Sequence, residues 1–131
     1  MLGDFLRAIF GMMEKGDYVP AQDKLDEAFV TLLKKDATSF DGIAPGELIS
    51  TLMQDPDLAQ IRDNTLEYLE ILAGLFYARA LLSEAQHKMA QSEDCLLKSL
   101  ILYEEVDNVS QTFSVERQTR MRSIREKLRH G

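Results

Sequence analysis

The chain has 131 residues, of which 45% are hydrophobic and 28% are charged, and its net charge is −7. This length predicts one domain, residues 1–131, with too many apolar side chains for a disordered chain. The acidic balance argues against general nucleic-acid binding, and a single cysteine excludes a framework of internal disulfides.

The most apolar stretch, residues 66–82, holds 13 hydrophobic residues out of 17. Three charged residues interrupt it, and it is shorter than the ~20 apolar residues of a membrane-spanning helix. We therefore interpret it as a helix that is buried on most sides. The first 13 residues have no basic segment before the apolar one, so we expect no signal peptide, no membrane contact and a cytoplasmic location.

Two helices are predicted in the first 35 residues. Apolar residues recur at helical spacing from Asp4 to Lys15, and Gly16 stands where a left-handed helix cap is expected. A second helix is predicted from Pro20 to about Lys35, because proline is tolerated in a first helical turn. The connection, residues 16–19, is short enough to make the two helices antiparallel neighbours.

The middle of the chain is predicted to hold a loop and two short helical pieces. Residues 36–42 are polar and small, which indicates the loop, and a short helix follows Ala44. Asp55 and Pro56 are typical of a helix cap and a first helical residue. The buried side of that second piece is predicted to consist of Leu58 and Ile61. Whether this piece continues into the next helix stays open.

Three further helices are predicted after the middle segment. They run from Thr65 to Lys88, from about residue 92 to Val106, and from Ser114 onward, with Asp107 and Asn108 ending the second of them. Ser114 is the predicted N-cap of the last helix. No stretch alternates polar and apolar residues with a period of two, so the predicted fold class is all-α.

A spacing pattern occurs twice. A tyrosine, an alanine, a leucine and an alanine stand at relative positions 0, 3, 7 and 10 of the second helix: Tyr18, Ala21, Leu25 and Ala28. A weaker version returns 71 positions later in Met89, Ser92, Leu96 and Ser99. In helical repeats of about 34 residues, such small residues let paired helices approach closely. An offset of 71 residues is about two such repeats plus three residues. We therefore interpret residues 36–64 as a degraded repeat between the two patterns.

With these residues the chain resembles a tetratricopeptide-repeat domain and, more narrowly, a group of small bacterial proteins of unknown function with this layout. The resemblance covers most of the chain and is best over residues 16–29. It implies antiparallel helical hairpins, a basic capping helix after Ser114, and an interaction scaffold without catalytic residues. Ile9, Met12 and Leu33 depart from the usual repeat residues. An irregular helical bundle is the alternative.

Two places in the sequence carry residue types that could support chemistry. Glu84 and His87 form a Glu-x-x-His motif, which could place a carboxylate and an imidazole on one helical face, as in di-iron bundles. Such a site needs the motif twice, and His130 is the only other histidine, so we favour a solvated helix end. Cys95 follows two acidic residues, which raise a thiol pKa, and is interpreted as structural. We predict no metal, no cofactor and no catalytic residue.

Positive charge gathers at the C-terminus. Residues 114–131 carry a net charge of +4, whereas residues 1–113 carry −11. The last helix could dock through an apolar stripe, formed by Met121, Ile124 and Leu128, with its arginines beside acidic neighbours. It could instead contact an acidic partner or a second copy of the chain. A third possibility is attraction to the phosphates of RNA or of an anionic membrane.

The sequence therefore predicts a non-catalytic module that binds a segment of another protein. The candidate partner-binding residues are Tyr68, Phe76, Tyr77, Tyr103, Arg117 and Arg120. For the aromatic residues, packing in the core is the alternative. A different class of function is structural self-association through the apolar faces of residues 66–82 and 95–106. An enzyme of an unrecognised kind is the third.

Overall fold

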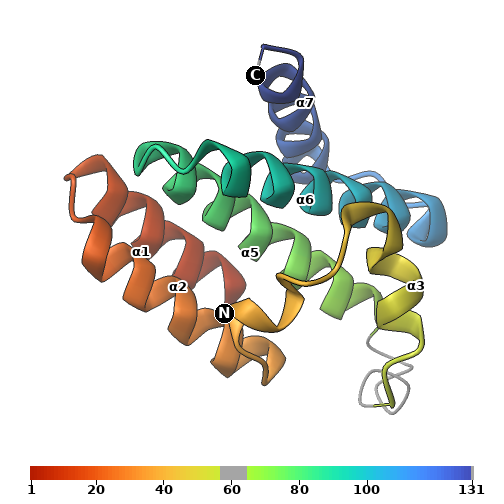
Figure 1. The fold of residues 1–131 in the computed structure, drawn as a ribbon. Coiled ribbons are helices and arrows are strands. Elements are labelled where there is room, and N and C mark those ends of the chain that lie inside the picture. The colour runs from red at the N-terminus through yellow and green to blue at the C-terminus, as the bar shows by residue number, and fades with distance from the viewer. Residues whose placement is uncertain (57–64, 131) are drawn as a thin grey trace.

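A computed structural model describes residues 1–56 and 65–130, and it confirms the all-α fold class (Figure 1). This part of the chain contains no strand. Its α-helices are α1 (Leu2–Glu14), α2 (Tyr18–Leu33), α3 (Leu48–Met53), α5 (Thr65–Ala85), α6 (Met89–Ser110) and α7 (Val115–His130). Two short 3₁₀ helices are η1 (Ala37–Phe40) and η2 (Pro45–Glu47). The predicted buried residues Leu58 and Ile61 lie outside the described residues.

The helices α1 and α2 form one antiparallel hairpin, and α5 and α6 form another (Figure 1). The central helix is α5, which packs against α1, α2 and α6, so its interpretation as a helix buried on most sides is confirmed. The apolar faces of residues 66–82 and 95–106, which were candidates for self-association, are largely buried by this packing within one chain. None of the helices in residues 1–56 and 65–130 is long and apolar enough to cross a membrane.

The turns of the two hairpins have the same backbone geometry. In the first, Gly16 has a φ of 78°, and the next N–H donates to the carbonyl oxygen of Met12 at 2.9 Å. In the second, His87 has a φ of 62°, and the next N–H donates to the carbonyl oxygen of Ser83 at 2.8 Å. Both are Schellman motifs. Each residue of one turn lies 71 positions from its counterpart, so the sequence offset is also a structural one.

The small residues of the two patterns also have equivalent surroundings. Ala21 and Ala28 are completely buried in the first hairpin. Their counterparts Ser92 and Ser99 are buried too, and their hydroxyls donate to carbonyl oxygens of α5 at 2.9 and 2.7 Å. Each serine thus satisfies its own hydroxyl while it keeps α6 close to α5. Leu25 is fully buried between the two alanines, and Tyr18 is partly buried against the core.

The shared turn geometry predicts that His87→Gly stabilises the protein. A left-handed conformation costs a residue with a side chain ~1–2 kcal/mol, and the greater freedom of glycine in the unfolded chain offsets part of the gain. We expect the free energy of unfolding, measured with urea, to rise by ~0.5–1 kcal/mol. As the reciprocal control, Gly16→Ala should lower it by ~1 kcal/mol. An added Cβ at Gly16 meets no neighbouring atom, so only the backbone is strained.

The prediction of a plain polar loop over residues 36–42 was wrong. This segment forms η1 and sends Ala37 and Phe40 into the core, where Phe40 is only 2% exposed. The ring centroid of Phe40 lies 6.2 Å from that of Phe29 and 5.7 Å from that of Phe76. The segment therefore fills the space between the two hairpins. The described residues of the proposed middle repeat, 36–56, form no helical hairpin.

Two cations hold this segment on the second hairpin. Lys98 is completely buried, donates to the carbonyl oxygen of Phe40 at 2.9 Å and pairs with Asp94 at 2.8 Å. Arg79 forms a bidentate pair with Asp41, at 2.7 and 3.3 Å. Burial of a cation is tolerated when it is paired in this way. Both cations therefore have a structural role, because they fix η1 and the residue after it on the second hairpin.

The helix boundaries differ from the predicted ones at several places. The second helix begins at Tyr18, so Pro20 lies inside its first turn. The long helix ends at Ala85 instead of Lys88. The following helix begins at Met89 instead of about residue 92, and it continues past Asp107 to residue 110, with the Asp107 side chain bound to Arg117 and Gln118 of α7.

Candidate partner-binding groove

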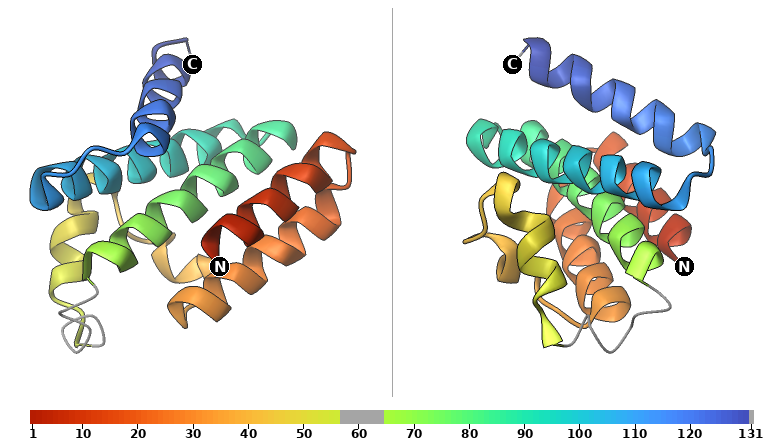
Figure 2. Two further views of the ribbon diagram at one scale, coloured as in Figure 1. Left: turned by 180° about the vertical axis from the view of Figure 1, so that it is seen from behind. Right: turned by 90° about the vertical axis from the view of Figure 1, so that its right-hand side faces the viewer.

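The last helix docks on the second hairpin, where it packs mainly against α6 and crosses α5 obliquely (Figure 2). Three successive side-chain contacts join α7 to α5: Arg117 with Glu70, Ser123 with Tyr77, and Lys127 with Glu84. Met121 and Ile124 are buried against the core, and Leu128 is partly buried. Docking of the basic helix through its apolar stripe is thus confirmed. The predicted N-cap is confirmed as well, since the Ser114 hydroxyl accepts from the N–H of Arg117 at 3.2 Å.

Arg117 is used entirely within the chain. It is 4% exposed, and its guanidinium donates to Asp107, to Glu70 and to the carbonyl oxygen of Thr112. Burial opposes ionisation of Asp107, but hydrogen bonds from Gln118 and Arg117 outweigh it and lower the pKa of Asp107. This carboxylate therefore stabilises the fold above its ordinary pKa and loses that contribution as the pH falls through the lowered value. Arg117 offers no surface to a partner.

Three helices contribute to one row of partly exposed side chains. The rings of Phe10 from α1 and Tyr77 from α5 meet edge to face, with centroids 6.3 Å apart. The guanidinium of Arg120 from α7 lies 5.8 Å from the Tyr77 ring and donates to the hydroxyl of Tyr103 at 3.0 Å. The structure thus brings together the predicted residues Tyr77, Tyr103 and Arg120. We use the name candidate groove for this row, Phe10–Tyr77–Arg120, together with a neighbouring pocket between α1, α5 and α7 to which Arg120 also belongs.

A pocket of about 200 Å³ lies in this groove, where α1, α5 and α7 begin. Its apolar lining comes from Leu2, Leu6 and Ile71, and its polar lining includes Tyr103, Arg120 and Glu116. Burial raises the pKa of Tyr103 in spite of the neighbouring Arg120 charge, so the phenol keeps its proton at neutral pH. The pocket therefore offers apolar side chains, the neutral hydroxyl of Tyr103, and the ion pair between Arg120 and Glu116.

Phe10 was not among the predicted site residues. Its contact with Tyr77 joins positions 67 residues apart in the sequence, and no local pattern reports such a pair. The 71-residue offset does point to Phe10, because it makes Leu6 the counterpart of Tyr77. Phe10 lies one helical turn after Leu6, on the same face of α1. Superposing the two halves of the sequence would have placed this face of α1 in the groove.

The other predicted aromatic residues pack inside. Phe76 is fully buried beside Phe40, and Tyr68 is buried as well. For these two residues the structure gives the core position that was the alternative, and the same holds for Tyr103, which is 1% exposed. Cys95 is also buried, and burial raises the pKa of its thiol to about 11, which keeps it protonated at neutral pH.

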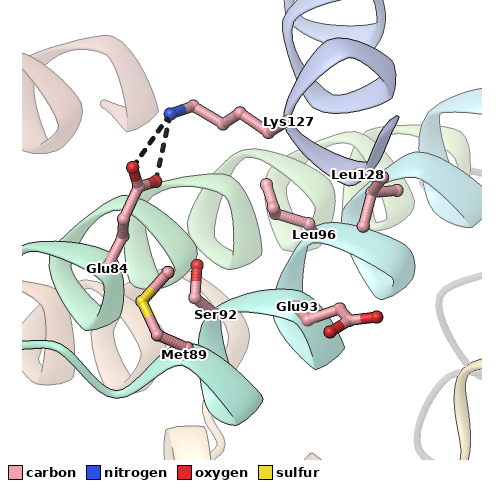
Figure 3. A pocket seen from close by; sticks show the side chains of 7 residues that line it. All are labelled: Glu84, Met89, Ser92, Glu93, Leu96, Lys127 and Leu128. Atoms are coloured by element: carbon pink, nitrogen blue, oxygen red, sulfur yellow. Dashed lines mark hydrogen bonds and ion pairs between the residues drawn. The ribbon is translucent and has the colours of Figure 1, made fainter. Parts of the chain in front are cut away.

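A second hollow, of about 270 Å³, lies at the opposite end of the seam between α7 and the hairpin (Figure 3). Leu96 and Leu128 form its apolar walls, and Met89 lies at its edge. The carboxylate of Glu84 and the amine of Lys127 point toward each other across it, 3.0 Å apart. It contains none of the candidate partner-binding residues.

The Glu-x-x-His motif does not lie on one helical face. Glu84 is in the last turn of α5 and pairs with Lys127, whereas His87 lies beyond the helix end in a left-handed conformation. That element of the metal hypothesis was therefore wrong. Within residues 1–56 and 65–130, no three His, Cys, Asp or Glu side chains gather where they could hold a metal ion.

Comparison with known proteins finds no matching family model, no matching curated protein and no matching solved structure. The tetratricopeptide-like assignment accordingly stays a prediction from the residues and from the arrangement of the helices.

Proposed function

We propose that this chain is a non-catalytic, tetratricopeptide-like interaction module that binds a segment of another protein in the groove between α1, α5 and α7. The observation that carries the proposal is the Phe10–Tyr77–Arg120 row, in which the partly exposed Tyr77 ring lies close to both the Phe10 ring and the Arg120 guanidinium, so that three helices contribute. Tyrosine and arginine are among the residues that supply most of the binding energy at protein interfaces.

The size of the neighbouring pocket supports a peptide ligand. At about 200 Å³ it is smaller than the ~300–1,000 Å³ of typical small-molecule sites. One apolar side chain of a partner fits such a volume, with the partner backbone lying across the Tyr77 ring. Segments bound in this way are extended or helical, and a few anchoring side chains determine their specificity.

The test is affinity capture from a lysate of the source cell, with mass spectrometry of the retained proteins. We expect one protein to be retained in near-stoichiometric amount through high salt. Tyr77→Ala and Arg120→Ala should each reduce its retention about tenfold or more, the effect of losing one anchoring residue. Tyr77→Phe, which keeps the ring, and Arg7→Ala, which removes an exposed arginine elsewhere on α1, should leave retention unchanged.

Circular dichroism of each variant checks that the helices are intact. Retention of the same partner by Tyr77→Ala and Arg120→Ala at the wild-type level would contradict the proposal. An empty capture by the wild-type chain would also contradict it.

A further inference from the structure

The solvent face of α7 carries a row of three arginines. Arg122, Arg125 and Arg129 are exposed, and their spacing of three and four residues places them on one face of the helix. Among the described residues none of them is in an ion pair, unlike Arg117, Arg120 and Lys127. Val115, exposed at the start of the helix, lies seven residues before Arg122 and therefore continues the same face.

The solvent face of α2 has the opposite charge and a matching spacing. Asp23 and Asp26 are exposed on it; Asp26 accepts a hydrogen bond from Gln22, and its charge also acts on Arg79. Two exposed valines, Val19 and Val30, stand at its ends. Val19 precedes Asp26 by seven residues, as Val115 precedes Arg122. An apolar contact and a charge contact therefore recur about 10.5 Å apart on both helices.

These two faces cannot meet within one molecule. The helices α2 and α7 lie at opposite ends of the row of helices, with α5 and α6 between them (Figures 1 and 2). The charge differs in sign in the same way, because residues 114–131 carry +4, whereas α2, with Asp23, Asp26 and Glu27 against Lys24, carries −2. Opposite charges at the two ends of a molecule favour head-to-tail contact between copies.

We propose that the arginine face of α7 docks on the acidic face of α2 of a second copy of this chain. The contact is heterologous, so it leaves one face of each kind free and extends into short chains as the concentration rises. It uses neither the Phe10–Tyr77–Arg120 row nor the groove pocket, so partner binding and self-association are separable. A contact between two helix faces is small, and we expect a dissociation constant on the order of 100 μM.

Sedimentation velocity of purified protein tests the contact. We expect the wild-type chain to associate in about 0.01 M salt and to dissociate in about 1 M salt, because the Debye length falls from ~30 to ~3 Å. The triple variant Arg122→Glu/Arg125→Glu/Arg129→Glu and the double variant Asp23→Arg/Asp26→Arg should each be monomeric alone. An equimolar mixture of the two should associate again, because each junction between unlike copies is then complementary.

A matched control separates the local contact from net charge. Asp4→Arg/Glu14→Arg changes the net charge as much as Asp23→Arg/Asp26→Arg but leaves both docking faces intact, so it should associate like the wild type. Loss of association in this control, or a mixture of the reversed variants that stays monomeric, would overturn the proposal. A wild-type chain that is monomeric at low salt but binds RNA would assign the arginines to phosphates and overturn it too.

Discussion

Replacing Phe40 with alanine is expected to lower the free energy of unfolding by ~3–5 kcal/mol, the usual cost of removing a buried phenylalanine. The Phe40 ring packs between Phe29 and Phe76, which belong to different hairpins. Truncation therefore opens a cavity at the junction of the two hairpins. The carbonyl oxygen of Phe40 accepts a hydrogen bond from Lys98, so the backbone of η1 has little freedom to move into the cavity.

Urea denaturation of Phe40→Ala measures this loss, with Phe113→Ala as the matched control. Phe113 is 78% exposed in the connection between α6 and α7, so its truncation should change stability by no more than ~0.5 kcal/mol. A loss below ~1 kcal/mol for Phe40→Ala would contradict the docking of η1 described above.

Leu25→Ala is expected to cost ~2–5 kcal/mol. Leu25 is fully buried in the middle of α2, between Ala21 and Ala28, where the helices approach closely. Close backbone packing limits relaxation around a lost side chain, which places the expected cost in the upper half of this range.

The thermal midpoint and the free energy from urea denaturation both report this change. Val19→Ala, on the exposed face of the same helix, is the control and should stay within ~0.5 kcal/mol of the wild type. An unchanged midpoint for Leu25→Ala would refute the placement of the Tyr18–Ala28 face in the core.

Local periodicity accounts for what the sequence predicted well. Apolar spacing located the helices on either side of the first tight turn, and the glycine at position 16 marked that turn correctly, whereas the second turn was predicted several residues too late. The segment around Phe40 was missed because its order depends on Arg79 and Lys98, which are 38 and 58 residues away from their partners. One phenylalanine in a polar stretch gives no periodic signal.

The sequence named several side chains of the candidate groove, but it did not predict which of them contact one another. Tyr77, Tyr103 and Arg120 were named from the sequence, but their mutual contact requires α7 to dock where it reaches both α5 and α6. Arg117 was named beside Arg120 because both are basic residues of one helix. Only the crossing of α7 over α6 puts Arg117 inside and leaves Arg120 at the edge of the groove.

The two Schellman turns also determine which contacts form early when the chain folds. Each hairpin is closed by a turn of a few residues, so its contacts are local in sequence, and local contacts form quickly. The docking of Phe40 on Phe76 and Lys98 requires the second hairpin to exist first. We therefore assign this docking to the late side of the folding barrier. A defect there accelerates unfolding and leaves the folding rate almost unchanged.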